Sequence, residues 1–210
     1  MKTLLKLFLV ILLYGINTLS AQDKYTNGMQ KALDLWGQQK ITEASNLFER
    51  IAMAEDDNWL PYYYVALVNT TASFGEQDQA KLTQQLEKAK EFVDIAKNIS
   101  PDNPELFVME ALVNTAWIAF DGATYGMTLS GKNTQLYNKA LELAPKNPRV
   151  VFSKAEWDMG AARYFGKDTA PYCKDVERAV ELFANFSNDT PFYPQWGKDR
   201  AEQVAKECKG

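Results

Sequence analysis

Small and apolar residues recur along most of the chain at the three- and four-residue spacing of helices. In one early segment, Ala32, Leu35, Ala44, Phe48 and Ile51 keep this spacing within two helices joined by a turn. No stretch shows sustained alternation of apolar and polar residues, so the sequence predicts essentially no sheet. The pattern predicts helices near residues 25–38, 41–55, 58–74, 80–99, 104–120, 133–144, 148–165, 172–186 and 195–208.

Two copies of a helix-ending motif indicate an internal repeat. Residues 96–104 align with residues 140–148, 44 positions later. Each copy has a small residue, an apolar residue three positions on, and then a proline that cannot continue the helix. An Asn-Pro pair then begins the next helix, because proline is well tolerated in a first turn. The sequence therefore predicts helical hairpins that follow one another as repeats.

These residues resemble the tetratricopeptide repeat (TPR) family, in which pairs of antiparallel helices stack into a solenoid. The family places small residues at fixed positions of each helix pair and a proline after the second helix. The resemblance implies an all-α solenoid of about four helical hairpins, followed by a C-terminal helix. The residues that carry it are Ala32, Ala44 and Phe48; Ala66, Ala89, Ala96 and Pro101; Ala111, Tyr137, Ala140 and Pro145; and Ala155 and Ala179.

The later repeats are longer than those of the family. The family separates two of its small positions by 19 residues, whereas the matching positions of units two, three and four lie 30, 29 and 24 residues apart. Each later hairpin therefore has an insertion, which either lengthens its helices or forms a loop on one face of the stack. Residues 192–199, with the helix that follows them, resemble the ending of some exported bacterial TPR-like proteins without an assigned activity.

In the resembling family the first helix of each hairpin lines the concave face, which implies where a ligand would bind. The corresponding positions here are mostly apolar or aromatic, with some polar groups that could contact a peptide backbone. If exposed, this strip would be a groove for an extended or helical segment; if the last helix or the insertions covered it, it would be core. The candidate binding residues are Met29, Leu33, Trp36, Tyr63, Leu67, Asn69, Thr70, Val108, Leu112, Asn114, Phe152, Glu156, Asp158 and Met159.

The first 21 residues have the features of a secretory signal peptide. Lys2 and Lys6 accompany an apolar run at residues 7–16, and small residues precede Gln22. Because this run is short for a helix that must cross ~30 Å of hydrocarbon, we expect cleavage and no stable membrane anchor afterwards. We accordingly expect export to the periplasm or out of the cell.

Export also bears on the two cysteines and on the domain division. An oxidising compartment favours a disulfide between Cys173 and Cys208, with two unpaired thiols as the alternative. The expected division is a signal peptide at residues 1–21 and a TPR-like domain at 22–210, which ends in a capping segment at 187–210.

The composition excludes several kinds of chemistry. The chain has no histidine, which removes His-dependent nucleophiles and imidazole metal ligands, and two cysteines cannot form a four-thiolate zinc site. A formal net charge of −4 without a basic run argues against nucleic acid as a partner. Residues 126–133 approach a phosphate-binding loop, but Asn133 replaces the required Ser or Thr. We therefore expect no cofactor, no metal site and no catalytic residue.

These observations favour a module that binds a protein or peptide segment without catalysis. Two other functions stay open. One is a carboxylate-dependent hydrolase or carbohydrate-active protein, for which Glu156 and Asp158 give the only indication. The other is a structural module whose groove is closed by its own tail. The sequence leaves the identity of the ligand and the oligomeric state open.

Overall fold

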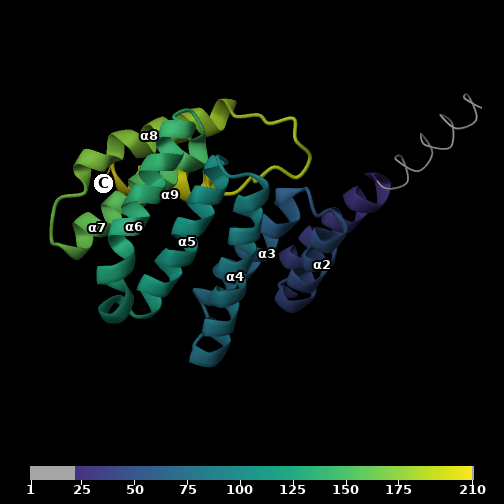
Figure 1. Ribbon diagram of the computed structural model, residues 1–210. Coiled ribbons are helices and arrows are strands. Elements are labelled where there is room, and N and C mark those ends of the chain that lie inside the picture. The colour runs from purple at the N-terminus through teal and green to yellow at the C-terminus, as the bar shows by residue number, and fades with distance from the viewer. Residues whose placement is uncertain (1–21, 210) are drawn as a thin grey trace, which may run out of the picture.

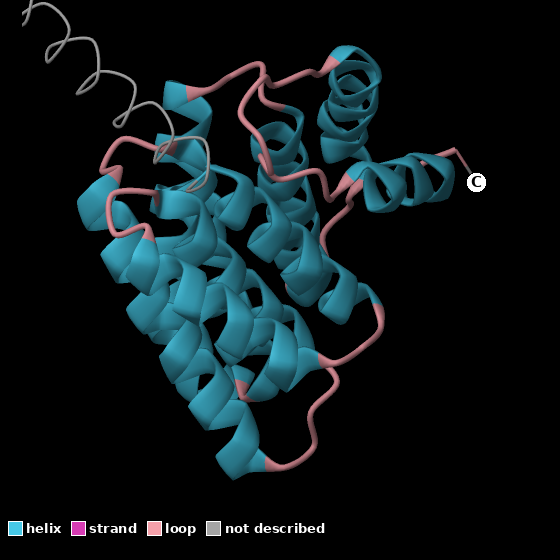
Figure 2. Cartoon of the chain, turned by 90° about the vertical axis from the view of Figure 1, so that its right-hand side faces the viewer, coloured by secondary structure: helices cyan, strands magenta, loops and turns pink. Residues whose placement is uncertain are grey.

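The computed structural model describes residues 22–209, which form helices and connecting turns without a strand (Figure 2). The positions of the predicted helices are confirmed to within a few residues, except that the sixth helix begins at Gly122 rather than near residue 133. The predicted signal peptide lies outside the described residues. The helices cover residues 22–37, Ile41–Ala54 (α2), Trp59–Ser73 (α3), Gln79–Ile99 (α4), Pro104–Phe120 (α5), Gly122–Leu143 (α6), Pro148–Tyr164 (α7), Ala170–Asn185 (α8) and Lys198–Glu207 (α9).

Five consecutive helices, α3 to α7, begin after an Asn or Asp whose side chain caps the helix. Each of these side chains accepts a hydrogen bond from a backbone N–H group in the first turn. Such a cap satisfies a donor that the helix leaves open and is worth about 1 kcal/mol. The starts of these helices are therefore determined locally. The capping residues are Asn58, Asp78, Asn103, Asp121 and Asn147.

Consecutive helices pair into hairpins that stack side by side, so the fold is the expected TPR-like solenoid (Figure 1). Helix 22–37 is followed by α2, α3 pairs with α4, α5 with α6 and α7 with α8, and α9 packs against α8. The alanines that define the repeat are buried, which allows neighbouring backbones to approach closely. They are Ala32, Ala44, Ala66, Ala89, Ala96, Ala111, Ala140, Ala155 and Ala179.

The insertions in the second and third hairpins lengthen their helices. Helices α4 and α6 have 21 and 22 residues, compared with 14 in α2. Residues 126–133, which approach a phosphate-binding loop in sequence, lie within α6. Asn133 is buried there, and its Nδ2 donates to the Ala111 carbonyl and to Thr115 Oγ1, each at 3.0 Å. The resemblance to a nucleotide loop therefore has no structural counterpart.

After α8 the chain runs back across the stack before α9 begins (Figure 1). Residues 186–197, called the strap below, lie against the N-terminal ends of α3, α5 and α7. The Tyr64 hydroxyl donates to the backbone carbonyl of Phe192 at 2.9 Å, and Trp196 Nε1 donates to the Tyr63 hydroxyl at 2.6 Å. The strap therefore covers the part of the first-helix strip that contains Tyr63.

A disulfide joins the start of α8 to the end of α9. Cys173 and Cys208 are bonded, with their Cα atoms 5.8 Å apart, so the predicted pairing is confirmed. Because the strap lies between these two helices in sequence, the disulfide closes a covalent loop that contains the strap. Among residues 22–209, no helix has the length and apolarity needed to span a bilayer.

Candidate functional site

Most of the candidate strip belongs to the core and does not face solvent. The sequence left open whether the strip is an exposed groove or part of the core. The buried members of the strip are core, and the strap covers one end of it. Five members stay half-buried: Leu33, Trp36, Leu112, Glu156 and Asp158. The buried members are Met29, Tyr63, Leu67, Asn69, Thr70, Val108, Asn114, Phe152 and Met159.

The buried polar members of the strip mostly bond within the stack. Asn69 Nδ2 donates to Ser45 Oγ at 2.8 Å and to the Val65 carbonyl at 2.7 Å, and the Thr70 hydroxyl donates to its own helix. The Nδ2 atom of Asn114 is buried without a hydrogen-bond partner among the described residues. Asn69 thus joins α3 to α2, whereas the Thr70 hydroxyl bonds within α3, and both donors are already used inside the stack.

A buried ion pair holds the covered end of the strip. Arg149 contacts Glu105 through two nitrogens, with Nη2 and Oε1 2.8 Å apart, and the Tyr193 hydroxyl donates to the same Oε1 at 3.0 Å. Burial opposes the charge on Arg149, but the hydrogen bonds and charge of Glu105 outweigh it, so the pKa of Arg149 is raised. Burial, together with the Glu105 charge, raises the pKa of Tyr193. This end of the stack is therefore a closed polar cluster.

The two carboxylates considered for hydrolysis each face a cation. Glu156 Oε1 accepts from Arg200 Nε of α9 at 2.7 Å, and Asp158 pairs with Lys154 one turn away. A hydrolase of the glycosidase type needs two carboxyl groups facing a substrate across a cleft.

Among the described residues, no cluster of three or more His, Cys, Asp or Glu side chains could hold a metal ion.

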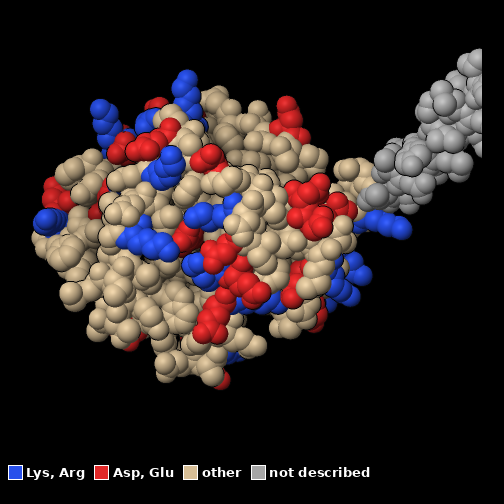
Figure 3. Space-filling view, in the orientation of Figure 1, with Lys and Arg blue, Asp and Glu red and all other residues tan. Residues whose placement is uncertain are grey.

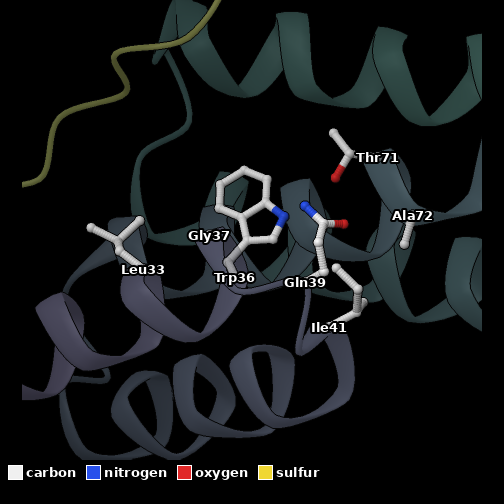
Figure 4. A pocket seen from close by; sticks show the side chains of 7 residues that line it. All are labelled: Leu33, Trp36, Gly37, Gln39, Ile41, Thr71 and Ala72. Atoms are coloured by element: carbon white, nitrogen blue, oxygen red, sulfur yellow. The ribbon is translucent and has the colours of Figure 1, made fainter.

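The open part of the strip is a pocket beside Trp36, with a volume of about 430 Å³ (Figure 4). It lies where helix 22–37 ends, next to the C-terminal end of α3. Leu33, Ile41 and Ala72 supply apolar walls, and the Trp36 indole stands in the middle of the view. The pocket is lined by Leu33, Trp36, Gly37, Gln39, Ile41, Thr71 and Ala72, a set without a formal charge. We call it the Trp36 pocket.

Two of these residues, Leu33 and Trp36, belong to the candidate strip, and the family positions do not indicate the others. Thr71 and Ala72 follow the assigned position Thr70 on α3, so the open face is displaced from the one that the family positions imply. Gln39 lies in the turn after the first described helix, where a pattern based on helix positions has no information. Its backbone is left-handed, with φ of 61°, and no signal in the sequence indicates this.

A second cavity of about 360 Å³ lies between Tyr25, the α2–α3 turn and the strap residues Thr190 and Pro191.

The tip of the α5–α6 hairpin is nearly free of charge, since residues 111–131 contain one charged side chain, Asp121. Figure 3 shows this sparsely charged surface over the lower part of α5 and α6. Met127 is 94% exposed there.

The fold and the open pocket describe a helical-hairpin solenoid with an accessible, uncharged recess beside Trp36. Among solved structures, the HusA haemophore from Porphyromonas gingivalis has this fold, with a TM-score of 0.77 and 22% identity over 88% of this chain and 92% of that chain. TTC0263, a thermophilic TPR protein from Thermus thermophilus, matches with a TM-score of 0.42 and 15% identity over 88% and 98%. No family model and no curated protein matches the sequence.

Proposed function

We propose that this chain is an exported, non-catalytic binding protein that holds an apolar, aromatic ligand in the Trp36 pocket. The observation that carries the proposal is the pocket itself: an uncharged recess with a tryptophan, within a stack whose other first-helix positions are largely core. The lining of the recess is about equally polar and apolar, and concave sites that combine an aromatic wall with a few polar groups are typical of small-molecule sites. The disulfide is in keeping with an oxidising compartment, as the proposed export requires.

A porphyrin is the ligand class that we favour. The fold likeness to a haemophore supports this choice, and a recess of about 430 Å³ is within the usual size range of small-molecule sites. The pocket lining contains no His, Cys, Met or Tyr. The ring would therefore be held by its apolar face against Trp36 rather than through the iron. Metal-free and ferric porphyrin should then bind with similar affinity.

Titration of the protein with haemin and with protoporphyrin IX tests this function. Binding is followed by porphyrin absorbance and by quenching of tryptophan fluorescence. We expect both ligands to bind, and Trp36→Ala to weaken each by at least tenfold because the aromatic face is lost. Tyr164→Ala is the matched control, since Tyr164 is an exposed aromatic residue of α7 outside the pocket. Equal affinity of all three proteins would refute the site.

A second candidate ligand is a protein or peptide segment that inserts one apolar side chain into the same pocket. The half-buried Leu33 and Trp36 favour it, because an aromatic anchor in a recess is the usual centre of a peptide interface. Binding of such a segment would compete with protoporphyrin IX. A partner that binds Trp36→Ala as well as it binds the wild type would place the peptide site elsewhere.

A further inference from the structure

Gln39 occupies a backbone conformation that usually requires glycine. It follows the last turn of helix 22–37, and the Lys40 N–H returns to the Leu35 carbonyl at 3.0 Å to close the turn. The residue that turns the chain in this motif is left-handed, and glycine is preferred because it has no Cβ. Gln39 adopts φ of 61° in this place. Gln39 thus places a side chain at a position where glycine would favour folding.

The side chain of Gln39 lines the Trp36 pocket. Figure 4 shows its amide and the Trp36 indole nitrogen directed toward the same space, beneath Thr71. Gln39 is exposed and Trp36 is half-buried, and neither group has a hydrogen-bond partner elsewhere in residues 22–209. By contrast, the indole nitrogens of Trp157 and Trp196 both donate within the chain.

The donors and acceptors around this space point to one kind of substituent. The Thr71 hydroxyl donates to the Leu67 carbonyl at 2.8 Å, so its proton is already used. The N–H groups that face the pocket are those of Trp36 and of the Gln39 amide, whose oxygen lies on the side of Thr71 and Ala72, and the lining has no carboxylate that would repel an anion. N–H donors that converge beside apolar walls fit a carboxylate on an otherwise apolar molecule, since hydrogen bonds to an ionised acceptor are the stronger ones.

We propose that Gln39 and Trp36 recognise a carboxylate on the ligand, and that Gln39 is the specificity-determining residue. This inference rests on the Trp36 pocket being the ligand site, but it does not depend on the ligand being a porphyrin. It explains why glutamine occupies the turn: the amide contributes to binding at the expense of backbone strain.

The test compares an aromatic carboxylate with its ester. Pyrenebutyrate and its methyl ester differ only in the group that Gln39 would contact, and both are followed by fluorescence. We expect wild type to bind the acid at least tenfold more tightly than the ester, and Gln39→Gly to reduce this ratio to below threefold. Because glycine relieves the left-handed backbone, Gln39→Gly should also raise the melting temperature by about 2 °C, which shows that the variant is folded.

Each outcome separates this inference from the proposed function. Equal binding of acid and ester by the wild type, or an unchanged ratio in Gln39→Gly, overturns carboxylate recognition even if porphyrin binds and Trp36→Ala abolishes that binding. Preference for the acid, lost in Gln39→Gly, supports it even if porphyrin does not bind. Failure of both pyrene compounds to bind overturns it as well.

Discussion

Glu105 and Arg149 stand at the same position of consecutive repeats, 44 residues apart, and form an ion pair in the interior of the stack. Their side chains are 0% and 1% exposed. Each residue follows the Asn-Pro pair at the start of its helix. Asn147, which caps α7, also donates through Nδ2 to Glu105 Oε1 at 2.6 Å. The pair thus joins the N-terminal ends of α5 and α7, and Tyr193 ties the strap to the same carboxylate.

We expect Arg149→Met to destabilise the fold by about 3–5 kcal/mol. The substitution keeps much of the side-chain volume but leaves the Glu105 carboxylate buried without a cation, which is the costly way to break such a pair. Urea-induced unfolding, followed by circular dichroism, measures the loss. The double variant with Glu105→Leu should recover part of it, because no isolated charge then stays buried. A single variant that loses less than about 1 kcal/mol would contradict this account.

The architecture could be predicted because its determinants are local. Asn-Pro pairs, helix-ending prolines and alanines at repeated positions specify where helices begin, end and pack. The predicted start of the sixth helix near residue 133 is wrong, because the glycine-containing residues 122–132 also form helix. Asp121 caps that segment and no proline interrupts it, so it continues as helix.

The site was harder to predict, since it depends on which faces are covered. The strap covers Tyr63 and contacts it through a hydrogen bond from Trp196, which lies 133 positions later in the sequence. Helical periodicity contains no information on such a distant contact. The ion pair of Glu105 with Arg149 follows from the repeat only once the two helix ends are known to be adjacent. Gln39, which lines the pocket, has a left-handed backbone that the local sequence does not specify.

The turn from the strap into α9 gives a second prediction. Gly197 has φ of 103°, and a Cβ there would lie 3.1 Å from Phe183 Cζ and 3.4 Å from Arg149 Cγ. Gly197→Ala should therefore destabilise the protein by about 1–3 kcal/mol, through strain and crowding together. Gly160→Ala is the matched control: apart from its chain neighbours and the nearby backbone of α7, no atom lies within 4 Å of the position that its methyl group would take, and it should gain about 0.5–1 kcal/mol. Thermal unfolding of both variants measures the difference, and equal effects would argue against the strained turn.

The disulfide gives a third prediction. Cys173 and Cys208 are 35 residues apart, and replacing both by serine should cost about 2–4 kcal/mol, mainly because the unfolded chain gains freedom. Reductant should lower the melting temperature of the wild type to that of the double variant and leave the variant unchanged. Ligand affinity at the Trp36 pocket should be retained, because the bond lies in the last hairpin. A wild type unaffected by complete reduction would show that the bond contributes little.

Glu110 links three helices through its carboxylate. Lys97 of α4 and Lys132 of α6 both pair with it, the latter at 2.6 Å, and its side chain is 5% exposed. Burial alone would raise the pKa of this carboxyl, but the hydrogen bonds and charges of the two lysines outweigh it and hold the pKa below the ordinary value of 4.5. The folded state therefore binds the Glu110 proton more weakly than the unfolded state does.

A carboxyl with a lowered pKa stabilises the fold above its unfolded pKa and loses that contribution as the pH falls through its folded pKa. For the wild type we expect the free energy of unfolding to decrease as the pH is lowered below about 4.5, in part through Glu110. Glu110→Gln should lose about 1–2 kcal/mol at pH 7 and show a shallower decrease in acid, since this group no longer takes up a proton. Urea unfolding between pH 7 and pH 3 measures both slopes. Glu91→Gln, at an exposed glutamate of α4, should follow the wild type; identical acid slopes for all three proteins would remove Glu110 from the account.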